Sequence, residues 1–156
     1  MLPQTLSKQR FGELVKFLMG QYRVVGPVCK SAQAAPGCGH AFEVIEDASQ
    51  LDMAYPTTML PPKKFLMPQY ETLLTYKKKN GSRHVESPLA VEPTVILGMH
   101  PYDIYATWVL DIAMMKDPGD ANYKARRDRA VIIGLDIDTP ADEYMFSRDT
   151  GTIDVD

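Results

Sequence analysis

The sequence predicts an α/β fold: a small mixed sheet with an N-terminal helix and a C-terminal parallel strand–helix–strand crossover. Helical spacing of apolar residues over 7–19, followed by two short β-branched segments, predicts the N-terminal part. Two continuous apolar runs, 95–98 and 130–137, flank a longer helical pattern and indicate buried strands. Two such strands joined through a helix form a right-handed parallel crossover.

We expect a single α/β domain, because 156 residues suffice for one hydrophobic core and are few for two. Four successive parts are expected along residues 1–156. They are an N-terminal helix and hairpin (1–50), a proline-rich segment with a basic hairpin (51–93), a strand–helix–strand unit (94–140) and an acidic tail (141–156).

The first part begins with an amphipathic helix. Its apolar positions include Leu14 and Leu18, which lie on one face, and Gly20 is a plausible end. Segments 22–28 and 41–45 are then predicted as two strands of a hairpin, because they are apolar and rich in β-branched residues. The small polar residues between them predict a surface loop.

The second part has two local signals. Segment 55–69 is predicted to be extended or turning, not helical, because proline fixes φ and lacks a backbone donor. Asn80-Gly81 is the strongest turn signal of the chain and predicts a hairpin. The lysines at 77–79 and Arg83 make its tip basic, which is typical of a solvated hairpin end or of a docking patch.

The third part contains the clearest helix, which begins at Pro101, where the missing N–H costs nothing. Its apolar residues repeat at helical spacing and predict one broad face of the kind that packs on a core. That face comprises Ile104, Tyr105, Trp108, Val109, Ile112 and Met115. Residues 122–129 predict a second, short and basic helix before the last strand.

Composition and charge exclude several classes of partner. The formal net charge of −3 gives no overall attraction to nucleic acid, and no apolar run is long enough for membrane insertion. The polar residues 1–10 do not resemble a secretion signal, and two cysteines fit a reducing compartment. We therefore expect a cytoplasmic protein with no nucleic-acid partner.

No constellation of catalytic residues is predicted. Phosphate-binding glycine motifs and nucleophile motifs are absent from the sequence. His100 beside Asp103 is the one suggestive pair, and a helix-capping or partner-facing histidine is the favoured interpretation. Cys29, Cys38 and His40 offer three donors where a metal site needs about four, so we predict two free thiols and no metal site.

Several motifs, in the right order, resemble a known family of proteins. They are LPPKKFLMP at 60–68 followed by ETLL at 71–74, GMHPYD at 98–103, YKARRD at 123–128 and DEYMF at 142–146. The pattern is similar to the N-terminal domain of sulfhydrogenase β subunits and of the A-type subunit of anaerobic sulfite reductases. Those proteins are 4Fe-4S dicluster electron-transfer subunits, so the resemblance implies an α/β domain that precedes a ferredoxin-like module.

This chain departs from the family where the family has cysteines, which are replaced by Tyr102, Tyr144 and Phe146. The resemblance therefore implies vacated cluster positions, which three aromatic rings could fill, since each buries on the order of 150–250 Å². Two cysteines cannot supply the four thiolates of a 4Fe-4S cluster. The residues expected to contact a partner or line a pocket are Lys63, Lys64, His100, Asp103, Arg126 and Arg127.

Three functional hypotheses follow from the resemblance. The favoured one is a non-catalytic docking subunit of a redox complex, with no cofactor of its own and with 4Fe-4S clusters or flavin in the partner subunits. The second is a fragment of a split electron-transfer subunit, whose cluster-binding remainder is another chain. The third is an enzyme or small-molecule binder that uses the vacated pocket, lined by Tyr102, Tyr144 and His100.

Overall fold

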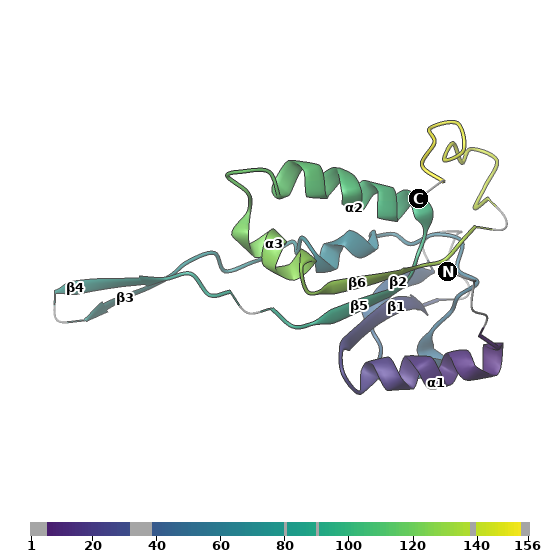
Figure 1. The fold of residues 1–156 in the computed structure, drawn as a ribbon, viewed down its shortest axis with the longest axis horizontal. Coiled ribbons are helices and arrows are strands. Elements are labelled where there is room, and N and C mark those ends of the chain that lie inside the picture. Colours follow the sequence, from purple (N-terminus) through teal and green to yellow (C-terminus); the bar gives the residue numbers. More distant parts are fainter. Residues whose placement is uncertain (1–5, 32–38, 80, 90, 138–139, 154–156) are drawn as a thin grey trace, which may run out of the picture.

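The computed structural model describes residues 6–31, 39–79, 81–89, 91–137 and 140–153. The body of the protein is a four-stranded sheet with helices on both faces, and a separate two-stranded hairpin extends away from it (Figure 1). Within these residues, the helices are all too short or too polar to cross a membrane.

The sheet is mixed and has the strand order β2–β1–β5–β6. β1 (Arg23–Cys29) and β2 (His40–Val44) form an antiparallel hairpin. β5 (Thr94–Met99) lies parallel to β1, and β6 (Ala130–Gly134) lies parallel to β5. The chain between β5 and β6 is helical, so these two strands form the predicted crossover. The predicted fold class is confirmed.

The helix α1 (Lys8–Met19) covers one face of the sheet. It begins at Ser7, whose hydroxyl accepts a hydrogen bond from the Arg10 N–H at 3.3 Å, and it ends at Gly20, as predicted. A short 3₁₀ turn, η1 (Ala48–Gln50), lies beside it. The buried residues of this layer are Val15, Val24, Ile45, Val95 and Leu97.

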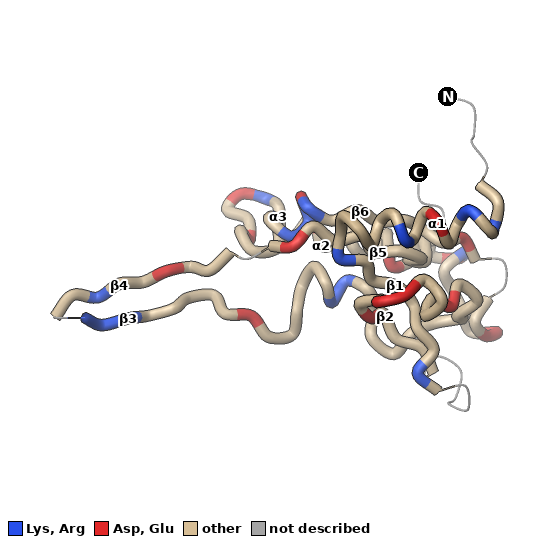
Figure 2. The backbone as a smooth tube through the Cα atoms, turned by 90° about the horizontal axis from the view of Figure 1, so that it is seen from below, with Lys and Arg blue, Asp and Glu red and all other residues tan. Residues whose placement is uncertain are grey.

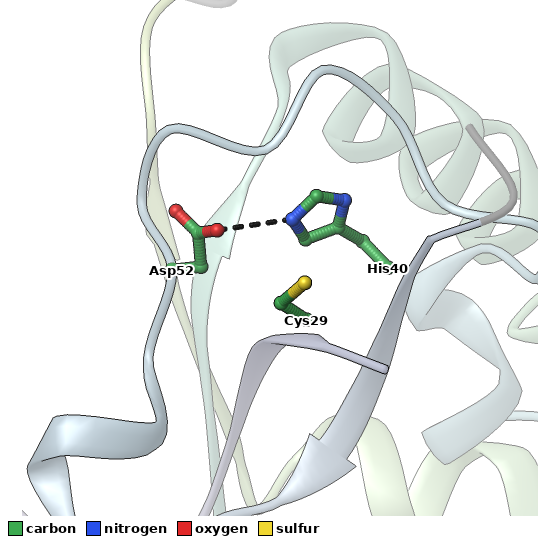
Figure 3. A group of neighbouring side chains, drawn as sticks. All are labelled: Cys29, His40 and Asp52. Atoms are coloured by element: carbon green, nitrogen blue, oxygen red, sulfur yellow. Dashed lines mark hydrogen bonds and ion pairs between the residues drawn. The ribbon is translucent and has the colours of Figure 1, made fainter. Parts of the chain in front are cut away.

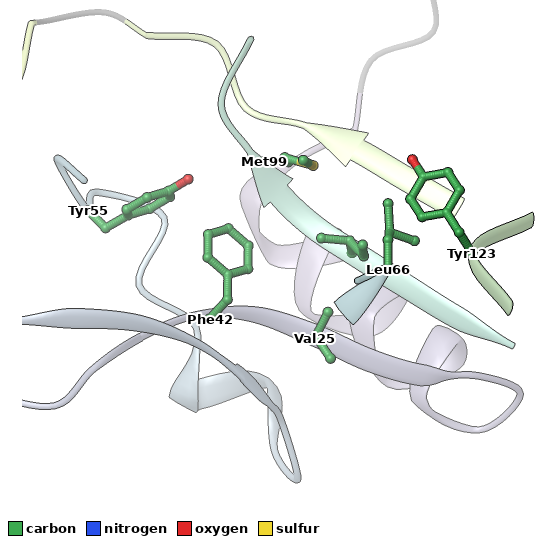
Figure 4. Close-up of a cluster of buried hydrophobic side chains, with 7 residues drawn as sticks. Val25, Phe42, Tyr55, Leu66, Met99 and Tyr123 are labelled. Carbon is green, nitrogen blue, oxygen red and sulfur yellow. The ribbon is translucent and has the colours of Figure 1, made fainter. Parts of the chain in front are cut away.

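The opposite face is covered by α2 (Pro101–Met114), α3 (Ala121–Arg127) and the 3₁₀ turn η2 (Pro62–Phe65). The prediction that the proline-rich segment contains no helix is therefore wrong at η2, because Pro62 occupies a first-turn position that needs no N–H. The buried side chains of this layer are Val25, Phe42, Tyr55, Leu66, Ile96, Met99 and Tyr123 (Figure 4).

The helix α2 does not bury the face that its apolar periodicity predicts. Ile104 and Met115 pack against the core, together with Leu110 and Met114. Much of the rest of the predicted face is exposed, because α2 is apolar on more than one side and the sheet covers only one of them. These exposed residues, called here the outer face of α2, are Tyr105, Trp108, Val109 and Ile112.

The predicted basic hairpin is a two-stranded arm, made of β3 (Thr75–Lys79) and β4 (Ser82–Glu86). Its turn includes Gly81, which has the positive φ of 81° that the turn requires, while Asn80 lies outside the described residues. The arm projects from the body with basic residues near its tip (Figure 2). Nearly all of its side chains are exposed.

Candidate functional site

The carboxyl end of β5 bends into α2 through an irregularity in the sheet. The register between β5 and β6 shifts between Leu97 and Met99, and Gly98 has a φ of +83°. The Gly98 carbonyl accepts a hydrogen bond from the Tyr55 hydroxyl at 2.8 Å. Tyr55 comes from the proline-rich segment, so this bond ties that segment to the carboxyl ends of the parallel strands, the edge at which open α/β sheets generally bind ligands.

His100 lies at the centre of this edge. It occupies the N-cap position of α2, but its side chain makes no capping hydrogen bond. Its ring stacks on Tyr55, with centroids 4.2 Å apart and an interplanar angle of 3°. The His100 Nδ1 lies 2.8 Å from the Tyr102 hydroxyl. His100 therefore takes the helix-capping position that was one of the two expectations for it, although its side chain supplies no capping bond and is only 4% exposed.

Burial shifts the ionisation of this cluster. It lowers the pKa of His100 to about 4, so the imidazole is neutral at neutral pH. It raises the pKa of Asp103 to about 6, although the nearby positive charge of Lys63 acts in the opposite direction. Burial also raises the pKa values of Tyr55 and Tyr102. At neutral pH His100, Tyr55 and Tyr102 are therefore uncharged and form a hydrogen-bonded support for the start of α2.

A second polar cluster lies at the carboxyl end of β1, where Cys29, His40 and Asp52 point toward one another (Figure 3). The His40 Nε2 is 3.0 Å from Asp52 Oδ2. This hydrogen bond and a second one from the Ala54 N–H lower the pKa of Asp52. The ring of His40 also lies 6.3 Å from that of Tyr55, so Tyr55 contacts both clusters.

Tyr102 and Tyr144, two of the three residues expected to replace cluster cysteines, line one cavity. This cavity, of about 270 Å³, is lined by Thr57, Tyr102, Ala141, Asp142, Tyr144, Met145 and Ser147. Tyr144 and Phe146 are 69% and 63% exposed, so the expectation that all three aromatic rings fill a buried space is wrong for these two. The phenol of Tyr102 is partly buried and bonded to His100.

The cavity residues do not fit an iron–sulfur cluster. Such a cluster is held by about four cysteine thiolates. The described lining residues supply phenol, hydroxyl, carboxylate and thioether groups in their place. The chain has only two cysteines, of which Cys29 lies at the end of β1 and Cys38 lies outside the described residues.

The basic residues predicted as partner contacts interact within the chain. The Arg126 Nε donates to the Leu66 carbonyl at 2.7 Å, and its terminal nitrogens pair with Glu71. Arg126 also lines a cavity of about 570 Å³ beside Arg23. The other three also interact within the chain. The Arg127 Nε donates to both carboxylate oxygens of Asp111, and Lys64 lies over the ring of Phe65. The positive charge of Lys63 acts on the carboxyl of Asp103.

Sequence reasoning did not identify Tyr55 or Asp52 as site residues. Tyr55 lies 45 positions before His100, and Asp52 lies 12 positions after His40. Neither belongs to a motif with a fixed spacing. One usable signal was the pair of residues Cys29 and His40 at the facing ends of a predicted hairpin.

Comparison with known proteins finds a similar curated protein. Over 147 residues, which are 94% of this chain, the sequence is 31% identical to sulfhydrogenase 2 subunit beta of Pyrococcus furiosus. The chain spans about 40% of the length of that protein. No family model matches the chain, and no solved structure does. The identity supports the relation to sulfhydrogenase β subunits that the motifs indicated.

Proposed function

We propose that this chain, which is related to a sulfhydrogenase β subunit over most of its length, is a docking component of a redox complex. In this role it binds a partner subunit through the outer face of α2 and holds no iron–sulfur cluster. The relative is by its name one subunit of a larger enzyme, which supports the role in a complex. The observation that carries the docking role is the uncovered apolar face of α2.

The outer face of α2 has the composition of an interface. Its members are 37–54% exposed, and the rings of Tyr105 and Trp108 lie 5.4 Å apart. A helix that is apolar on two sides needs a cover on each of them, and the sheet supplies one. Tyrosine and tryptophan are the residues in which binding energy concentrates at protein interfaces. A partner subunit with a complementary apolar surface supplies the second cover.

The β3–β4 arm supports the same role. An isolated two-stranded hairpin is marginally stable in water, and gains stability when a further surface packs on it. The arm and its base expose apolar side chains that have no cover in the described structure. These are Leu73, Leu74, Tyr76, Val85 and Leu89. Its basic tip fits a partner with an acidic surface at that position.

The chemistry of the cofactor then belongs to the partner. The family that this chain resembles has cysteines at the positions of Tyr102, Tyr144 and Phe146, and none of these three residues can be a thiolate ligand. Electron transfer in such a complex requires 4Fe-4S clusters or flavin in other subunits. The contribution of this chain is to position those subunits through α2 and the arm.

The test is affinity purification of the tagged full chain from its native cell. We expect co-purified subunits to be identified by mass spectrometry and to contribute iron or flavin absorbance to the eluate. Trp108→Asp should remove them, because it places a charge at the centre of the apolar face. Tyr70→Asp is the matched control, since Tyr70 is a 92% exposed aromatic residue outside that face.

Two results would contradict the docking role. One is a wild-type chain that elutes as a colourless monomer from its native source. The other is a Trp108→Asp variant that retains the same iron- or flavin-containing partner as the Tyr70→Asp control. The isolated variant should stay folded and lose about 1–2 kcal/mol, because the buried half of the indole and its contact with Tyr105 are removed, and a thermal melt checks this.

A second candidate is one piece of a split electron-transfer subunit. It is favoured by the 40% share of the relative that this chain spans. The same purification separates the two proposals. A split subunit predicts a partner chain that carries closely spaced cysteines for 4Fe-4S clusters and aligns with the remainder of the relative, whereas the docking role does not require this alignment.

A further inference from the structure

We propose that Cys29, His40 and Asp52 form a binding site for a divalent transition-metal ion of the zinc class. Their ligand atoms, one from each side chain, lie within 4.8 Å of one another (Figure 3). The site lies at the carboxyl end of β1, apart from the outer face of α2. It does not rest on the docking role proposed above.

The hairpin register places two of the ligands side by side. Cys29 is the last residue of β1, His40 is the first residue of β2, and the two are direct partners across the antiparallel pair. Side chains of directly paired residues project from the same face, with Cβ atoms about 4.5–5.5 Å apart. The Lys30 N–H donates to the Gly39 carbonyl at 2.7 Å, which holds the pair together just beyond this position.

Backbone contacts of β1 also place the third ligand. Val28 and Leu51 form an isolated antiparallel bridge, and the Asp52 N–H donates to the Pro27 carbonyl at 2.9 Å. The Ala54 N–H then binds Asp52 Oδ1 at 3.0 Å and orients the carboxylate, which leaves Oδ2 toward His40. The end of β1, the start of β2 and the segment around Asp52 are therefore held together by backbone bonds that do not involve a metal. The three ligands are in place before an ion binds.

The distances fit a small ion. Zinc lies about 2.3 Å from sulfur and about 2.0–2.2 Å from nitrogen or oxygen, so tetrahedral ligand atoms are roughly 3.3–3.6 Å apart. The His40–Asp52 distance of 3.0 Å and the 4.8 Å limit on the others bracket that range. Rotation of the Cys29 side chain, which is exposed, is enough to close the remaining gap.

The donor set selects the class of metal. A metal-bound cysteine is a thiolate, which is a soft donor and favours soft or borderline cations. Sulfur disfavours the hard cations Ca²⁺ and Mg²⁺, and a mixed sulfur, nitrogen and oxygen set suits Zn²⁺ and its neighbours. Three protein ligands leave one coordination position open. The His40 and Asp52 side chains are 16% and 40% exposed, so an ion and a water molecule can reach that position.

The test uses the reduced, metal-stripped full chain and two metals. We expect one equivalent of Co²⁺ to produce thiolate-to-cobalt charge-transfer absorption, and Zn²⁺ to abolish it by displacing cobalt. Cys29→Ser should remove the charge-transfer absorption. His40→Gln and Asp52→Asn should each weaken Zn²⁺ binding by at least about tenfold, because loss of outer-shell partners alone costs 10–100-fold.

The chain offers a matched control. His84 and Glu86 form a second histidine–carboxylate pair, with Nε2 2.9 Å from Oε1, in the exposed arm. His84→Gln should leave the affinity for Zn²⁺ unchanged. Far-ultraviolet circular dichroism of each variant verifies the fold before titration.

Three outcomes would overturn the site. They are a wild-type chain that shows no thiolate band with Co²⁺, a Cys29→Ser variant that keeps the band, and a His84→Gln variant that loses as much affinity as His40→Gln.

Discussion

His100 and Asp103 lie three residues apart at the start of α2, and their ionisation affects stability in opposite directions. Burial lowers the pKa of His100 from 6.5 to about 4 and raises that of Asp103 from 3.8 to about 6. Replacement of Asp103 by asparagine keeps the shape of the side chain and removes one of the two titrations. The expected consequence is a change in how stability depends on pH.

The sign of each contribution follows from the protons bound by the folded and unfolded states. The lowered pKa of His100 means that the folded state binds fewer protons than the unfolded state. The contribution of His100 to the free energy of unfolding is therefore complete above pH 6.5 and is lost as pH falls to about 4. The raised pKa of Asp103 means that the folded state binds more protons than the unfolded state. The contribution of Asp103 to the free energy of unfolding is therefore complete below pH 3.8 and is lost as pH rises through about 6. Each shift corresponds to about 3 kcal/mol.

In the wild-type chain the two contributions therefore nearly cancel between pH 6.5 and 4. Asp103→Asn leaves His100 uncompensated, so the variant should lose about 3 kcal/mol relative to the wild type on going from pH 7 to pH 4. Urea unfolding at a series of pH values, followed by far-ultraviolet circular dichroism, measures both chains. All other groups cancel in the difference between the two curves.

Parallel stability curves for Asp103→Asn and the wild type would refute this reasoning, because they would mean that Asp103 ionises as it does in water. His100→Gln supplies the converse measurement. It removes a group whose protonation destabilises the folded state, so this variant should become more stable relative to the wild type as pH falls from 6.5 to 4.

Two further predictions concern the end of β5. Tyr55→Phe leaves the buried Gly98 carbonyl without its hydroxyl donor and should cost about 1–2 kcal/mol in urea unfolding; an unchanged midpoint would mean that water replaces the bond. Gly98→Ala should cost more than Gly81→Ala, which is the control for backbone strain alone. Both residues have positive φ, but an added Cβ at Gly98 would lie 3.1 Å from Met53 Cε, whereas Gly81 faces open space. Equal costs would contradict the crowding at Gly98.

The short-range patterns of the sequence predicted most of the elements correctly. The helix at α1, the β1–β2 hairpin, the arm and the β5–α2–β6 crossover were all expected from periodicity and turn residues. The reason is that each of these signals lies within one element or its adjacent turn. The one-turn helix η2 was missed, because proline excludes only the helix interior.

The orientation of α2 could not be read from its sequence. Ile104 and Met115 belong to the predicted apolar face and do pack on the core, whereas Trp108 and Ile112 belong to the same face and are exposed. A helix with apolar residues on several sides fits a sheet in more than one rotation. The other layer elements, including η2 and α3, decide which rotation buries the most surface.

The candidate sites also depend partly on local sequence patterns and partly on tertiary packing. The sequence by itself determined that β1 and β2 pair, that α2 begins at Pro101 and that two cysteines cannot ligate a 4Fe-4S cluster. Only the tertiary structure brought Asp52 to Cys29 and His40, and stacked Tyr55 on His100. Local patterns record the conformation of neighbouring residues, whereas contacts between distant segments depend on how whole elements pack, which no single spacing encodes.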